Sequence, residues 1–310
     1  MIDIKKIESQ IDEVAKMLLQ YENLLSNDPN NFSHKLSIDS LKSQIAELEK
    51  QLRFEKTKRD KEVIEIRLKG RTANGTIPLE VLSKLADGFS GTILNASYFI
   101  QFGNKVKKVK AREIHDIVDL RLAGLSTGST RLFIIANSSP DLFGRSLAEE
   151  SLKNSINLLQ SETSDELTEF ASKIGKESVK KLYKFITSIS NADMEVDLNW
   201  SSPTNEIFNW DGNKQKLLSV AQSLTNIQMS EPEVLEILGE LITISLRGNF
   251  EIKADDKRSI RGTFPNYLLE EIKTLTIGSN YACQLEKRTI LNLATESEKV
   301  YYTLLNIRHI

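Results

Sequence analysis

Residues 115–139 read HDIVDLRLAGLSTGSTRLFIIANSS, and the centre of this stretch decides between two kinds of fold. A phosphate-binding loop needs a Gly, about four residues and Gly-Lys-Ser/Thr, followed by a helix whose N-terminus faces the phosphate. Here three residues separate Gly124 from Gly128, no lysine follows Gly128, and both flanks resemble strands. A dinucleotide fingerprint fails as well, because it must also open a helix. We therefore predict a turn between two strands, with a positive φ at Gly124 or Gly128.

The first 60 residues show two heptad patterns separated by a turn. Asn, Asp and Pro cluster in SNDPNNFS at 26–33, which is typical of a turn. We predict an antiparallel coiled-coil hairpin over residues 1–61. The apolar stripe on each helix is narrow and buries little area, so we expect the hairpin to pair with a second copy or with another protein. The alternative is that it packs on the body of its own chain. The proposed oligomerisation seam consists of Ile4, Ile7, Ile11, Val14, Leu18, Ile38, Leu41, Ile45, Leu48 and Leu52.

After the hairpin the hydrophobic period changes from heptads to alternation. Ile64, Ile66 and Leu68 alternate with Glu65 and Arg67, which predicts a half-buried strand. Pro78 is well placed to begin a helix. Further helices are expected over 141–160, 164–190 and 211–228, and a strand over 194–200. These elements predict a central α/β-type domain over 62–230 that contains a helical insertion.

The hydrophobic pattern changes again in residues 231–310. Three short alternating strands, one short helix at 265–275 and two further strands at 280–295 and 299–310 are expected. Five short strands with one helix between them suggest a small β-barrel of the OB or SH3-like kind. The predicted fold class is therefore α+β, with three domains over 1–61, 62–230 and 231–310.

Several motifs of the middle and C-terminal parts resemble those of a broad group of uncharacterised bacterial proteins. The motifs are IPLEVLSKL at 77–85, LRLAGLSTGSTRLFI at 120–134, and GELITI, GNFEIK and IRGTF between 239 and 264. In that group a small α/β domain precedes a compact β-barrel, and the resemblance covers about residues 62–310. It implies a fold but no activity, because the group has none established. It offers no functional residues to transfer.

Composition limits the classes of function. The chain has 310 residues, 40% hydrophobic and 27% charged, which is ordinary for a globular protein. Its net charge of -2 gives no global field that would draw it to nucleic acid or an anionic membrane. The single cysteine, Cys283, cannot form an internal disulfide and suits a reducing compartment. Without a secretory pattern or a spanning apolar stretch, we expect a cytoplasmic protein with no membrane partner.

The most concentrated positive charge lies at 103–112, which we expect to be a connector. Its cations are Lys105, Lys107, Lys108, Lys110 and Arg112. They could bind nucleic-acid phosphates or an acidic protein surface, or form a solvated basic loop. No aromatic residues interleave with them to stack on bases. The predicted barrel carries several aromatics but has 10 Lys and Arg against 12 Asp and Glu, which argues against a strong phosphate groove.

Catalytic and metal-binding patterns are weak. His34, His115 and His309 are scattered, and Cys283 is isolated, so no zinc spacing exists. Glu113, His115, Asp116 and Asp119 could form half of a metal site, but the sequence shows no second cluster. No Ser/His/Asp set can be nominated. We expect no metal, no cofactor and no catalytic residue.

Two hypotheses about function follow from these patterns. The first is a non-catalytic interaction or assembly subunit, of the kind found in bacterial multi-gene systems such as phage defence or toxin–antitoxin pairs. The second is a nucleic-acid-binding module that uses residues 105–112 and the predicted barrel. An enzyme with an unrecognised site is the weakest alternative.

Overall fold

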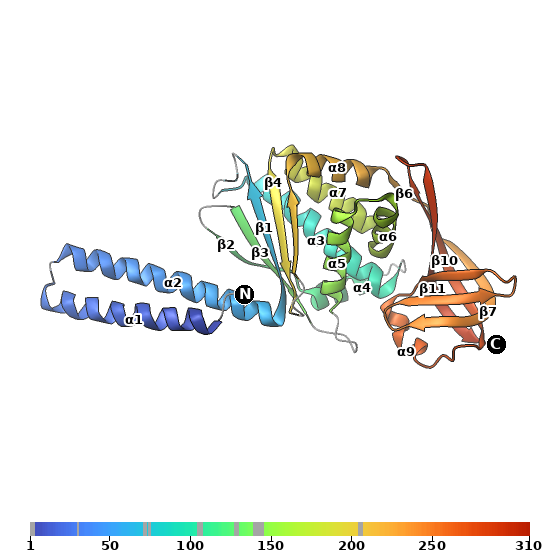
Figure 1. Ribbon diagram of the computed structural model, residues 1–310, viewed down its shortest axis with the longest axis horizontal. Coiled ribbons are helices and arrows are strands. Elements are labelled where there is room, and N and C mark those ends of the chain that lie inside the picture. Colours follow the sequence, from blue (N-terminus) through green and yellow to red (C-terminus); the bar gives the residue numbers. More distant parts are fainter. Residues whose placement is uncertain are drawn as a thin grey trace.

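The computed structural model describes residues 4–29, 31–70, 73, 76–103, 108–126, 130–138, 146–203 and 207–310. Three parts follow one another along its long axis: a pair of helices, a central sheet with helices beside it, and a strand-rich C-terminal part (Figure 1). Helices and two separate sheets are both present, which confirms the α+β class. None of the helices within these ranges is long and apolar enough to cross a bilayer.

The N-terminal pair of helices extends away from the rest of the molecule, and we call it the arm (Figure 1). It consists of α1 (Ile4–Asn27) and α2 (Phe32–Asp60). Asn31 begins α2, because its side-chain oxygen accepts a hydrogen bond from the backbone N–H of His34 at 3.2 Å. The helix α2 runs directly into the first strand. The two helices that the heptad patterns predict are therefore present.

The first sheet is built around the strand that follows the arm. Its order is β2-β3-β1-β4-β5, and every neighbouring pair is antiparallel. On β1, Ile64, Ile66 and Leu68 are buried, as the alternating pattern predicts. The strands are β1 (Lys61–Lys69), β2 (Arg121–Ser126), β3 (Thr130–Asn137), β4 (Glu195–Ser201) and β5 (Ile207–Gly212).

Helices cover one face of this sheet (Figure 1). They share one hydrophobic core with the buried side of β1, β3 and β4, to which Phe89, Phe185 and Trp200 contribute. The helices are α3 (Leu79–Phe102), α4 (Lys108–Val118), α5 (Leu147–Gln160), α6 (Ser164–Ile174), α7 (Lys176–Asn191) and α8 (Lys214–Thr225).

Some boundaries differ from the sequence-based expectations. The single helix expected over 164–190 is wrong: Gly175, at φ 79°, separates α6 from α7. A left-handed φ is accessible to glycine without steric cost and cannot continue a right-handed helix. The strand expected on the N-terminal flank of the AGLSTGST stretch is present, but it begins only at Arg121, because Ile117 and Val118 belong to α4. Two strands were not expected from the sequence: β5 and the short strand β6 (Ile227–Met229).

The second sheet contains six of the described strands, in the order β11-β9-β8-β7-β10-β6. A further pairing of β10 with β11 closes β7, β8, β9, β11 and β10 into a ring. The five strands and one short helical segment expected here are confirmed. The elements are β6 (Ile227–Met229), β7 (Glu233–Ser245), β8 (Asn249–Ala254), β9 (Ser259–Thr263), η1 (Asn266–Leu268), α9 (Leu269–Ile272), β10 (Asn280–Asn292) and β11 (Ser297–His309).

The ring has its own hydrophobic core, separate from that of the first sheet. Leu241, Ile252, Leu285 and Leu304 are fully buried in it. Where β9 meets β11, a Cβ on Gly262 would overlap the carbonyl oxygen of Tyr302 and lie 2.8 Å from the Phe250 ring. Only glycine lets the two backbones approach so closely, so this residue is required for the ring to close.

Candidate functional site

The arm holds most of the seam residues between its two helices. Ile7, Val14 and Ile38 are buried within a single chain. Around them Ile11, Leu18, Leu41, Ile45, Leu48 and Leu52 are half-buried, while the side chain of Ile4 lies outside the described residues. Glu22 and Lys42 form an ion pair of 3.3 Å across the helices, and the rings of Tyr21 and His34 lie 5.9 Å apart. The seam therefore closes the arm itself, and contact with a partner requires other side chains.

Large apolar side chains elsewhere on the arm face solvent. Phe32 is 76% exposed and Leu36 is 61% exposed, and their spacing of four residues places both on one side of α2. Met17 and Leu24, exposed by 48% and 47%, lie one heptad apart on one side of α1. We call these four residues the tip set. Large apolar side chains exposed on a projecting element are typical of a protein contact.

A buried carboxylate lies at the root of the arm. Glu62, two residues beyond α2, is fully buried. One of its oxygens accepts a hydrogen bond from Trp200 Nε1 at 2.9 Å, and the other accepts from Ser146 Oγ at 3.2 Å. Burial, together with the nearby charge of Glu149, raises the pKa of Glu62 to about 7, although the hydrogen bonds act in the opposite direction. Glu62 therefore changes its charge near neutral pH.

The expected basic connector is in part a helix. Lys108, Lys110 and Arg112 lie on α4, so the expectation of a connector is wrong for these three positions. Arg112 is exposed. Lys105 and Lys107, and the side chains of Lys108 and Lys110, lie outside the described residues.

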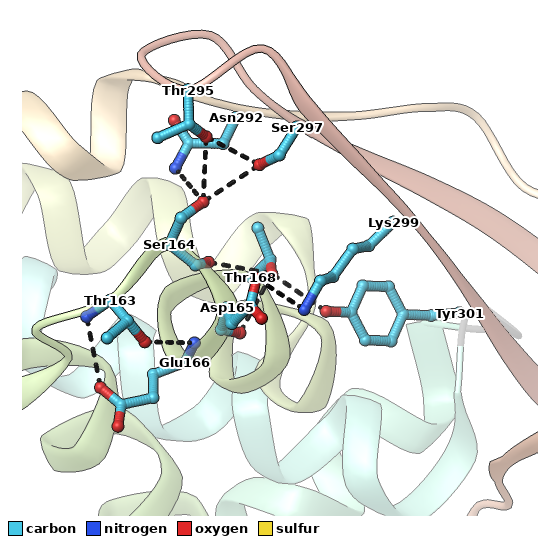
Figure 2. A network of polar contacts seen from close by, with 10 residues as sticks. All are labelled: Thr163, Ser164, Asp165, Glu166, Thr168, Asn292, Thr295, Ser297, Lys299 and Tyr301. Atoms are coloured by element: carbon cyan, nitrogen blue, oxygen red, sulfur yellow. Dashed lines mark hydrogen bonds and ion pairs between the residues drawn. The ribbon is translucent and has the colours of Figure 1, made fainter.

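A network of polar contacts, which we call the junction, connects α6 to the β10–β11 hairpin (Figure 2). The hydroxyl of Ser164 lies 2.8 Å from Asn292 Nδ2 and 3.1 Å from each of the hydroxyls of Thr295 and Ser297. The hydroxyls of Thr295 and Ser297 are themselves 2.7 Å apart. In the described part of the chain, none of these contacts comes from a histidine, lysine or carboxylate that could activate Ser164 as a nucleophile.

Two further contacts extend the junction along β11 (Figure 2). Lys299 Nζ lies 2.7 Å from Asp165 Oδ1, and this carboxylate raises the pKa of Lys299. The hydroxyl of Tyr301 donates to Thr168 Oγ1 at 3.0 Å, and burial raises the pKa of Tyr301. The junction therefore has a structural role: it connects the first core to the ring.

A groove of about 500 Å³ lies beside the junction, between α6 and the ring. Lys173 and Arg261 line it, but Lys173 is 2.6 Å from Glu169 and Arg261 is 3.1 Å from Glu251. Because each cation is paired with a carboxylate, the groove offers no excess positive charge to a phosphate backbone.

The remaining candidate residues do not converge on a site. Glu113, His115 and Asp116 are exposed on α4, and no cluster of three metal-ligating residues exists in the described ranges. Cys283 is buried inside the ring, and desolvation raises the pKa of its thiol to about 11. A thiol in such surroundings is unreactive.

The AGLSTGST stretch begins on β2, where residues 123–126 lie, and ends on β3 at Thr130, which confirms the two flanking strands; the residues between them lie outside the described residues. The strands β2 and β3 pair through Leu122 with Ile134 and Ser126 with Arg131. A β-bulge lies between Leu122 and Gly124. A positive φ was expected at Gly124 or Gly128. Gly124 does not have one, and Gly128 lies outside the described residues, so for Gly128 the expectation stays a prediction.

Comparisons with known proteins identified no relative of the chain. No family model matches the chain, and neither a curated protein nor a solved structure resembles it significantly.

Proposed function

We propose that this chain is a non-catalytic assembly subunit that joins a second copy of itself through the arm. The observation that carries the proposal is the tip set: Met17, Leu24, Phe32 and Leu36 are exposed on an element that projects from the body (Figure 1). Burying a side chain of this size contributes about 1.5–3 kcal/mol. In a dimer with a twofold axis, each copy would bury the same four residues against the other.

The proposal also includes the finer organisation of the chain. We infer that the ring belongs to the small barrels of OB or SH3-like type, and that domains extend over about 1–61, 62–230 and 231–310. Closure of five strands around a separate core supports this division. The pairing of β6 with β10 indicates that the last domain begins a few residues before 231.

Nucleic-acid binding is the alternative, and it has less support. The two cations that line the groove beside the ring, Lys173 and Arg261, are each paired with a carboxylate. A titration with labelled DNA and RNA at several salt concentrations tests it, because phosphate contacts give a steep salt dependence.

Sedimentation equilibrium of the full chain tests assembly through the arm. We expect a dimer for the natural sequence and a monomer when Leu24→Lys and Phe32→Lys are combined. Both positions are exposed, so the lysines leave the fold of a single chain intact. Leu19→Lys is the matched control, because Leu19 is 63% exposed on the same helix but about 140° around its axis from Leu24. A double variant that keeps the mass of the natural protein would contradict the role of the tip set.

A further inference from the structure

A second groove, of about 600 Å³, lies between α7, the end of α8 and β6. Its floor is apolar: Val179 and Leu224 are buried, and Ile227 and Met229 are half-buried. Tyr183 stands on its wall with 39% of its surface exposed. The volume is within the range of ligand-binding clefts. The groove is separate from both the arm and the junction.

One wall of this groove is positively charged. Lys176, Lys180 and Lys184 follow one another at intervals of four residues on α7, so they lie on one side of the helix. Lys176 is 2.9 Å from Glu231, and Lys180 is 2.7 Å from Glu177. Both are exposed ion pairs, which contribute little to stability. Three lysines thus stand against these two carboxylates, and the wall keeps an excess of positive charge that favours an occupant carrying carboxylates.

The opposite wall is the open edge of a strand. In the described part of the chain, β6 pairs with β10 alone. The N–H of Ser230 donates to Thr289 at 2.8 Å, and the carbonyl of Asn226 accepts from Leu293 at 2.9 Å. Because backbone groups alternate in direction along an antiparallel strand, the N–H and C=O groups of Ile227 and Met229 point away from β10. An open edge of this kind is a template for an added strand.

We propose that this groove binds an extended peptide segment in which acidic and apolar residues alternate, added as a strand to β6. Main-chain hydrogen bonds to Ile227 and Met229 set its direction. Its apolar side chains lie on the floor formed by Val179 and Leu224, and its carboxylates face the lysines of α7. Strand addition combined with pockets for alternate side chains is a common mode of peptide recognition. This proposal is independent of assembly through the arm.

Fluorescence anisotropy with the full chain tests the proposal. The probe is a labelled peptide of about eight residues that alternates Glu and Val; the comparison peptides alternate Lys and Val, or carry N-methyl groups along one edge. We expect the Glu–Val peptide to bind, and each comparison peptide to bind at least about tenfold more weakly. Lys180→Glu should weaken binding about fivefold or more, and Lys180→Glu with Lys184→Glu should abolish it. Lys214→Glu is the matched control, since Lys214 is similarly exposed and paired with one carboxylate, Asp193, but lies outside the groove.

Three outcomes would overturn the proposal. The first is equal binding of the Glu–Val and Lys–Val peptides. The second is unchanged binding of the N-methylated peptide, which would exclude strand addition. The third is an equal effect of Lys180→Glu and Lys214→Glu. If Lys180→Glu instead lowers the mass of the protein itself, the groove is filled by a second copy and the peptide proposal is wrong.

Discussion

Replacing the buried carboxylate at the root of the arm should change how stability depends on pH. Burial raises the pKa of Glu62 from an ordinary 4.5 to about 7 in the folded chain. The folded state thus holds this proton more tightly than the unfolded state. The contribution to stability is fully present below about pH 4.5 and is lost as pH rises through about 7. At about 1.4 kcal/mol per pKa unit, the loss amounts to about 3 kcal/mol at pH values above 7.

Glu62→Gln removes the ionisation and keeps the shape of the side chain. Its amide oxygen can still accept from Trp200 Nε1, and its NH₂ group can donate to Ser146 Oγ. We expect the two proteins to differ by no more than about 1 kcal/mol near pH 4.5. Near pH 8 the variant should be more stable than the natural protein by about 3 kcal/mol.

Urea unfolding followed by tryptophan fluorescence measures both free energies, because Trp200 contacts Glu62 directly. Glu65→Gln is the control: it removes a carboxylate from the next outward-facing position of β1, where Glu65 is 3.2 Å from Arg131. The Glu65→Gln protein should lose as much stability as the natural protein between about pH 5 and pH 8. A Glu62→Gln protein that keeps the same loss, or that is less stable than the natural protein near pH 8, would refute the reasoning.

Three further predictions concern the ring, the junction and the strand turn. Gly262→Ala should lower the free energy of unfolding by about 1–3 kcal/mol, because the added Cβ meets the Tyr302 carbonyl oxygen. Gly124→Ala is the comparison: Gly124 has no positive φ, and a Cβ there would make only an ordinary contact with Phe133 at 4.0 Å. This variant should leave the free energy of unfolding nearly unchanged in the same urea titration. Tyr301→Phe should cost about 1 kcal/mol by removing its hydrogen bond to the α6 residue at the junction, and a stability equal to that of the natural protein would contradict this role. The thiol of Cys283, with a pKa of about 11, should not react with a thiol reagent near neutral pH until urea unfolds the ring, and rapid reaction of the folded protein would show that it is accessible.

The elements with a strong local period could be predicted from the sequence. The heptad patterns predict the two helices of the arm, and the alternating patterns predict β1 and the strands of the ring, because one face of each of these elements is buried. The same alternation also indicates that Glu62 is buried. Glu62 is two residues from Ile64 and four from Ile66, so its side chain lies on the same, buried face of the strand. The alternation was recognised only from Ile64 onward, so the burial of Glu62 was not predicted.

Other features depend on information that local patterns lack. The apolar pair Ile114 and Val118 spans a single helical turn, which was too short to distinguish α4 from the start of a strand. In the junction, Ser164 contacts Asn292, which lies 128 residues away along the chain. The groove proposed to bind a peptide could not be predicted without knowing that β6 is an edge strand and that it lies opposite the lysines of α7. Both follow from tertiary packing rather than from any stretch of sequence.

The mass of the unaltered chain in solution tests assembly through the arm most directly. Light scattering over a series of micromolar concentrations should show a mass that rises towards twice 35.1 kDa. A mass that stays at 35.1 kDa at every concentration would contradict assembly with a second copy.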